Sequence, residues 1–133
     1  MLARRLFLGF SALVWLPYGV FCVFQPSFLA KAAGVIASSA TAVTEIRAMY
    51  GGLEAGIGAL CLCAVLRPSL VRPALLMLSF ICGGLGLTRI LGLVLDGSTS
   101  GYTIGGLALE LPSAAIATLL VRRSWSGAPP LSH

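Results

Sequence analysis

Four ionisable residues stand inside otherwise apolar stretches of this sequence: Arg47, Glu54, Arg89 and Glu110. A charged side chain at the centre of a lipid bilayer costs about 2.5–3.5 kcal/mol on insertion scales. We therefore expect these side chains to point toward one another or toward a bound molecule. Guanidinium and carboxylate groups in one place can hold the polar end of a ligand, and a buried carboxyl group can transfer a proton.

Helical spacing favours a common site for these residues. Arg47 and Glu54 are seven residues apart, which places them about 20° from eclipsed and about 10 Å apart along a regular α-helix. Tyrosine hydroxyls are expected in the same outer half of the membrane. The predicted site has two catalytic carboxylates, Glu54 and Glu110, and four ligand-binding residues, Arg47, Arg89, Tyr50 and Tyr18.

Four apolar stretches must position these side chains, and they cover residues 6–24, 45–66, 74–95 and 102–121. Each is close to the ~20 residues that a helix needs to cross a hydrocarbon core about 30 Å thick. The chain is 58% hydrophobic and only 10% charged, whereas soluble domains have about 25% charged residues. The sequence therefore predicts an all-α integral membrane bundle of four transmembrane helices, forming a single domain over residues 1–133.

The ends of these helices are marked by polar and proline-containing segments. Thr44 is the expected N-cap of the second helix, with Glu45 at its positive end. Residues 67–73, which contain two prolines, should separate the second helix from the third. Residues 27–43 are either a short helix at the membrane interface or a loop.

Each predicted helix also carries one face of small or polar residues, which is typical of the contact surfaces in membrane bundles. On the first helix this face contains Ser11, Trp15, Tyr18, Cys22 and Gln25, and on the second it contains Gly51 and Gly58. On the third helix it contains Ser79, Cys82, Gly86, Arg89 and Asp96. On the fourth it contains Thr103, Gly106, Glu110, Ser113 and Ala117. The remaining leucine, isoleucine, valine and phenylalanine side chains are expected to face lipid.

The distribution of positive charge predicts the orientation. If the four helices are threaded in order, six arginines lie on one side of the membrane: Arg4, Arg5, Arg67, Arg72, Arg122 and Arg123. Lys31 is the basic residue of the opposite loops. The positive-inside rule then places both termini in the cytoplasm. The net charge of +5 is thus a topology signal, and no nucleic acid partner is expected.

Metal and disulfide sites are not expected. Cys22, Cys61, Cys63 and Cys82 lie inside the predicted helices without a C-x-x-C pair, and Cys61 and Cys63 face nearly opposite ways. The single histidine, His133, is at the end of the chain. We therefore expect buried free thiols, no metal and no cofactor.

The segment from Glu45 to Gly56, with Arg47, Tyr50 and Glu54 in it, is followed by Arg89 in a glycine-rich third helix and by Glu110 in the fourth. This pattern resembles an uncharacterised bacterial family of small four-helix membrane proteins, domain of unknown function 4345. The similarity covers nearly the whole chain. It implies a multi-pass protein of the cytoplasmic membrane of a bacterium, but it implies no activity.

Several functions remain open at this point. The polar core is either a set of ion pairs that only holds the bundle together, or a pocket that binds an amphiphilic or isoprenoid-like molecule, or the site of an acid-catalysed cyclase or isomerase acting on a terpenoid or lipid. A further alternative is an accessory subunit of a membrane complex. The Gly83-Gly84 pair and the two glycines Gly52 and Gly56 also allow a close approach of helices, either within one chain or between two copies in a homodimer. A pocket is favoured because four ionisable groups are many for structural ion pairs in so small a bundle.

Overall fold

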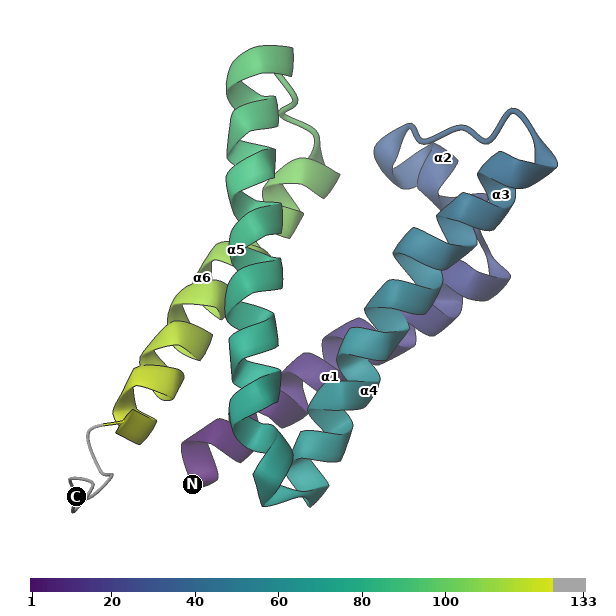
Figure 1. Ribbon diagram of the computed structural model, residues 1–133. Helices are drawn as coiled ribbons and strands as arrows, with labels where there is room; N and C mark the ends of the chain where they lie inside the picture. Colours follow the sequence, from purple (N-terminus) through teal and green to yellow (C-terminus); the bar gives the residue numbers. More distant parts are fainter. Residues whose placement is uncertain (126–133) are drawn as a thin grey trace, which may run out of the picture. The chain divides into compact units, whose positions relative to one another are not determined.

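The computed structural model describes residues 1–125, and these residues are almost entirely helical (Figure 1). The long helices are α1 (Leu2–Phe24), α4 (Leu53–Leu66), α5 (Val71–Asp96) and α6 (Gly101–Trp125). Two short helices, α2 (Phe28–Ala33) and α3 (Ala40–Ile46), lie between α1 and α4 in the chain. No strand occurs in the described part of the chain, so the predicted all-α class is confirmed.

Four helical stretches are long and apolar enough to cross a membrane: Leu2–Phe24, Ala40–Leu66, Pro68–Asp96 and Gly101–Arg123. The four predicted spanning helices are therefore confirmed by length and composition. All four helices begin before the predicted ranges, whereas the predicted ends at Phe24 and Leu66 are confirmed. Hydrophobicity marks the part of a helix that is in hydrocarbon and not where its hydrogen bonding starts or stops. Arg4 and Arg5, for example, lie within α1.

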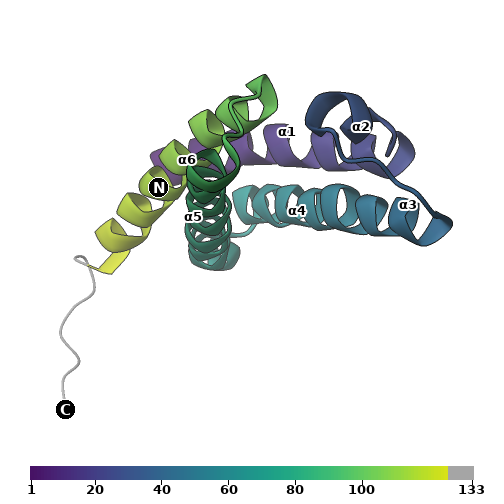
Figure 2. The same ribbon diagram turned by 90° about the horizontal axis from the view of Figure 1, so that it is seen from above.

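The chain divides into two compact units, Met1–Val71 and the part that begins at Arg72. In the first unit, α1 and α4 lie side by side (Figures 1 and 2). Their backbones approach closely at glycines: a Cβ added to Gly19 would lie 2.2 Å from the backbone nitrogen of Ala55, and one added to Gly58 would lie 2.3 Å from that of Leu16. Without a hydrophobic driving force between helices in lipid, such close packing supplies much of the attraction.

The second spanning helix begins earlier than predicted, and Thr44 is not its N-cap. Ser39 has an extended backbone and its hydroxyl accepts from the Ala42 amide at 3.1 Å, which is the geometry of an N-cap. Thr44 instead lies inside α3 and its hydroxyl donates to the Ala40 carbonyl at 3.1 Å. Residues 27–43 thus contain a short helix, a loop and the start of α3, which combines the two alternatives left open above.

A π-helical segment, η1 (Arg47–Gly52), joins α3 to α4. The seven-residue comparison of Arg47 with Glu54 assumed a regular α-helix, and a π-helix takes more residues for each turn. The two side chains are therefore rotated further apart around the helix than the sequence spacing predicts. Such π segments are frequent at functional sites, and this one carries Arg47 and Tyr50.

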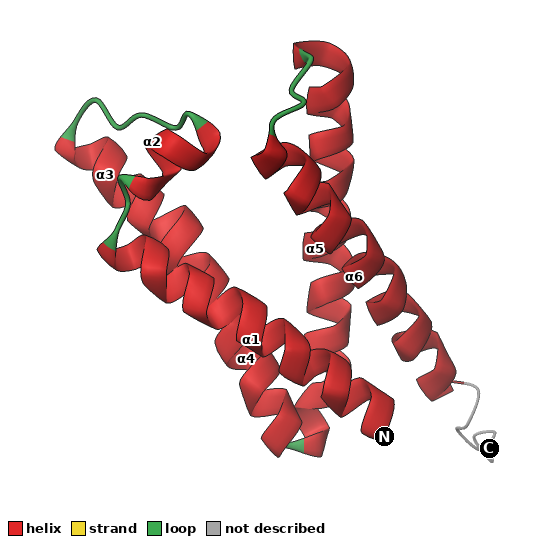
Figure 3. Ribbon diagram, turned by 180° about the vertical axis from the view of Figure 1, so that it is seen from behind, coloured by secondary structure: helices red, strands yellow, loops and turns green. Residues whose placement is uncertain are grey.

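In the second unit, α5 and α6 form a helical hairpin, and green loops connect the helices in Figure 3. A 3-10 helix, η2 (Pro68–Leu70), precedes α5. The predicted break over residues 67–73 is shorter than expected, because Pro73 lies in the first turn of α5, where a missing N–H breaks no helical hydrogen bond. A Cβ added to Gly86 would lie 2.6 Å from the Leu111 side chain, so α5 and α6 also pack at a glycine.

The predicted small and polar faces are largely buried. On α1, Ser11, Trp15 and Cys22 are buried, while Gln25 at the helix end is exposed. On α6, Thr103, Glu110, Ser113 and Ala117 are all buried at 8% exposure or less. The pattern of small and polar residues therefore identified the packed faces of these helices.

Candidate functional site

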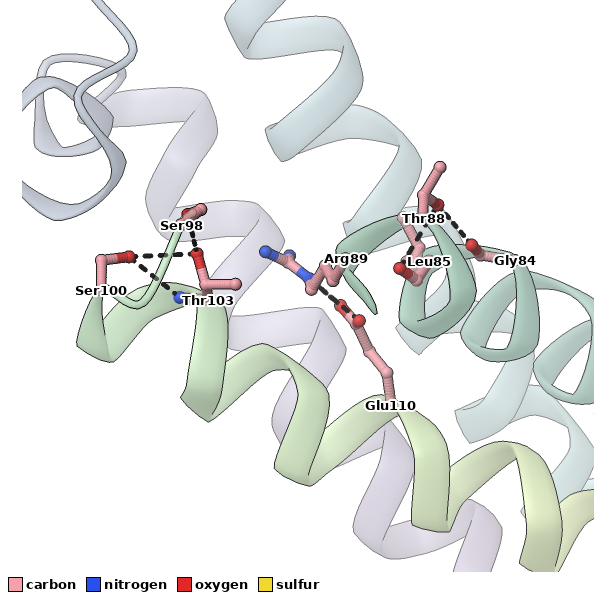
Figure 4. A network of polar contacts seen from close by, with 8 residues as sticks. All are labelled: Gly84, Leu85, Thr88, Arg89, Ser98, Ser100, Thr103 and Glu110. Carbon is pink, nitrogen blue, oxygen red and sulfur yellow. Dashed lines mark hydrogen bonds and ion pairs between the residues drawn. The ribbon is translucent and has the colours of Figure 1, made fainter. Parts of the chain in front are cut away.

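The best-defined polar contact in a spanning region joins Arg89 of α5 to Glu110 of α6 (Figure 4). The Arg89 Nε donates to both carboxylate oxygens of Glu110 at 2.9 Å. The side chain of Glu110 is 4% exposed and that of Arg89 is 25% exposed. The predicted approach of these two residues is thus found within the second unit, and it satisfies a carboxylate that would be costly to bury alone.

A glycine makes room for this ion pair. A Cβ added to Gly106 would lie 2.7 Å from Arg89 Nε and 2.8 Å from Arg89 Cζ. The guanidinium therefore lies against the backbone of α6, one turn before Glu110. Tyr102 packs near the same group, with its ring centroid 5.3 Å from Cζ, a distance within the range of a cation–π interaction.

Three side-chain hydroxyls form hydrogen bonds with one another at the N-terminus of α6. Thr103 Oγ1 lies 2.8 Å from Ser98 Oγ and 3.1 Å from Ser100 Oγ, and Ser100 Oγ accepts from the Thr103 amide at 3.2 Å. The last contact is that of an N-cap side chain with the amide three residues on. These hydroxyls are thus engaged with one another and with the helix end.

Arg47 has a different role from the one predicted for it. Its side chain is exposed and a terminal guanidinium nitrogen donates to the carbonyl of Val23, in the last turn of α1. The last carbonyls of a helix have no partner within the helix, and Pro26 supplies no N–H to Cys22. A positive charge at this end also interacts favourably with the negative, C-terminal end of the helix dipole. Arg47 therefore caps α1.

The other predicted residues of the first unit lie along α1, η1 and α4. Glu54 is half-buried in the first turn of α4, and its backbone carbon would be 2.8 Å from a Cβ on Gly19. Tyr18 and Tyr50 are half-buried as well. The Tyr18 hydroxyl and the Glu54 charge both lie near the Cys22 thiol. The convergence of Arg47 and Glu54 with Arg89 and Glu110 in one polar core stays a prediction.

The cysteines are free thiols, and Cys22, Cys61 and Cys82 are buried as expected. Cys63 is exposed, which contradicts the expectation of a buried thiol but confirms that it faces away from Cys61. Among the described residues, no group of three or more His, Cys, Asp or Glu side chains is placed to hold a metal ion. His133 lies outside the described residues.

None of the predicted site residues lines the apolar cavity at the end of α1. It has a volume of about 240 Å³ and is lined by residues from the end of α1 to α3, among them Pro26, Ala30, Val35, Val43 and Ile46. It contains no ionisable side chain among its lining residues. We therefore place the candidate site at the Arg89–Glu110 pair, where charge and burial occur together.

Sequence reasoning did not identify what Gly106 and Ser100 do. Gly106 and Glu110 are four residues apart and were assigned to the same helix face. This spacing was the signal available in the sequence that Gly106, which has no side chain, leaves space beside Glu110 for a charged partner. Ser100 stands directly before the helix that begins at Gly101, and a serine in that place is a usual N-cap.

The fold and the intramembrane ion pair define a small, multi-spanning helical membrane protein. The chain belongs to the family described as Domain of unknown function (DUF4345), whose model matches residues 3–121. No curated protein and no solved structure matches the chain.

Proposed function

We propose that this protein binds an amphiphilic or isoprenoid-like molecule within the membrane, with the polar end of the ligand at the Arg89–Glu110 pair. The proposal includes a location in the cytoplasmic membrane of a bacterium, with both termini in the cytoplasm. The observation that carries it is the shape of the ion pair. Both oxygens of Glu110 accept from Nε alone, so the pair does not use the two terminal nitrogens of a partly exposed guanidinium.

Structural ion pairs of arginine usually take two parallel N–H donors on one carboxylate. A pair that served only to hold α5 against α6 would gain most from that arrangement. Here the fork of the guanidinium is turned away from Glu110 (Figure 4), and in hydrocarbon its donors need acceptors. A ligand oxygen supplies them.

The enzyme alternative has less support. An acid-catalysed cyclase or isomerase needs a carboxyl group that donates a proton to the substrate. Both oxygens of Glu110 accept from the Arg89 Nε, so the carboxyl group is already engaged by its partner helix. The accessory-subunit alternative has no specific observation in its favour.

Photoaffinity labelling in lipid nanodiscs tests the proposal. The probe is an isoprenoid alcohol with a diazirine next to its hydroxyl, and the variants are Gly106→Ala and Gly105→Ala. A Cβ at Gly106 displaces the flexible Arg89 guanidinium, whereas one at Gly105 meets nothing within 4 Å. We expect the wild-type protein and Gly105→Ala to be labelled on α6 near Gly106, and Gly106→Ala to lose most of this labelling. Equal labelling of all three proteins would contradict the proposal.

A further inference from the structure

Glu110 does not use the two terminal nitrogens of the Arg89 guanidinium. A guanidinium has five N–H donors, and Glu110 takes the one on Nε. Figure 4 shows the two terminal nitrogens turned away from Glu110, toward the end of the hairpin that carries Ser98 and Thr103. Tyr102 adds a ring face and a hydroxyl beside the same group, so one phenol oxygen is present for the four remaining donors.

The hydroxyls nearby do not complete an anion site. Ser98, Ser100 and Thr103 bond to one another and to the start of α6, so they are engaged in closing the helix end. The donors that the site offers to a ligand are therefore those of Arg89.

The charge of the site argues against an anionic ligand. Arg89 and Glu110 together are neutral, and a phosphate or carboxylate bound to the outer edge would leave a net negative charge where burial penalises charge.

The surroundings are suited to an apolar chain. In the hydrophobic windows of α5 and α6 only 17% of each is buried, so packing within this hairpin leaves apolar side chains that can contact an apolar chain. Gly106 has no side chain, so the guanidinium lies directly against the backbone of α6. A ligand that suits this site has a small polar end group, which accepts hydrogen bonds from Arg89, and a long apolar chain, which contacts the apolar helix surface.

We infer that the ligand's polar end is an uncharged acceptor oxygen, a carbonyl such as that of a ketone, aldehyde or quinone, and not a phosphate or carboxylate. This inference rests on the function proposed above and specifies the class of molecule. The carbonyl oxygen accepts from the terminal nitrogens of Arg89 while Glu110 stays on Nε, so the ion pair remains intact and the site remains neutral.

Infrared spectroscopy of a labelled ketone tests this directly. The probe is 2-tridecanone with a ¹³C carbonyl, added to the full chain in nanodiscs, with empty nanodiscs as the reference. Hydrogen bonding to a guanidinium lowers the carbonyl stretching frequency, so we expect a second, lower-frequency band with the wild-type protein and with Gly105→Ala. The band should be absent from Arg89→Met, in which the side chain has no N–H donor, and from Gly106→Ala.

Competition then separates this inference from the proposed function. Unlabelled 2-tridecanone should remove the shifted band at concentrations about tenfold lower than dodecyl phosphate, a difference that corresponds to about 1.4 kcal/mol. If dodecyl phosphate is the stronger competitor, the carbonyl inference is wrong and the amphiphile-binding function stands. If the shifted band is the same in the wild-type protein, Arg89→Met and Gly106→Ala, both fail.

Discussion

The Nε atom of Arg89 lies 2.9 Å from each carboxylate oxygen of Glu110, so one N–H donor forms the ion pair between α5 and α6. The carboxylate is almost completely buried while the guanidinium is a quarter exposed. The two partners therefore depend on the pair to different degrees, because an unpaired buried charge costs far more than a partly solvated one.

Replacing one partner of this pair should destabilise the protein unequally. We expect Arg89→Leu to lower the free energy of unfolding by about 3 kcal/mol, since it leaves Glu110 buried without its partner. Glu110→Leu should cost less, because Arg89 retains some exposure. The double variant should recover most of the loss, with a coupling energy of about 1–3 kcal/mol.

Denaturation in mixed detergent micelles measures these values. Leu87→Ala is the control, because Leu87 is 67% exposed and its truncation should change stability little. Additive effects of the two single variants would show that the ion pair does not form.

Two glycines of α4 should respond differently to the same substitution. A Cβ at Gly58 would lie 2.3 Å from the backbone nitrogen of Leu16, whereas one at Gly56 meets nothing within 4 Å. Gly58→Ala should therefore push α1 and α4 apart and cost about 1–3 kcal/mol, as overpacking does. Gly56→Ala should be neutral or slightly stabilising, because alanine favours helix.

Thermal unfolding in detergent compares the two proteins. Equal melting temperatures for Gly58→Ala and Gly56→Ala would mean that α1 and α4 do not pack through this glycine. Loss of stability in Gly56→Ala alone would instead point to a contact of that face with a second copy of the chain.

Arg47 should matter for the stability of α1. Arg47→Met removes the donor to the Val23 carbonyl and should cost about 1 kcal/mol, at the lower end for a hydrogen bond to a charged group because Arg47 is exposed. The rate of backbone hydrogen exchange at the end of α1 should also increase in this variant. Glu45→Gln is a suitable control, since Glu45 is exposed two residues away. If Arg47→Met leaves exchange at Cys22 to Phe24 unchanged and instead abolishes probe labelling, Arg47 is a ligand residue and not a cap.

Thiol accessibility should establish the orientation of the chain in the membrane. On a Cys63→Ala background, which removes the exposed native thiol, Thr99→Cys should react with an impermeant maleimide added outside whole cells. Ser69→Cys, in η2, should react only after the membrane is opened. The reason is the positive-inside distribution of the arginines. The reverse labelling pattern would place both termini outside.

The sequence by itself determined the class of this protein and the helices that span the membrane, because about twenty consecutive apolar residues leave a backbone in lipid no alternative to a helix. It also identified the packed faces, since Glu110, Ser113 and Ala117 repeat at helical spacing. Helix starts were predicted less well: Ser39 and not Thr44 caps the second span, and both residue types are good N-caps, so composition could not distinguish them.

The tertiary structure alone decided how the charged residues are used. The four charged residues all lie in apolar stretches, and nothing in the sequence distinguishes how each one is paired. The close approach of α5 and α6 at Gly86 and Gly106 brings Arg89 to Glu110, whereas the π segment and the packing of α4 on α1 bring Arg47 to a backbone carbonyl at the end of α1. Which acceptor an arginine reaches depends on the distance and rotation between helices, and these are set by packing between segments far apart in the chain.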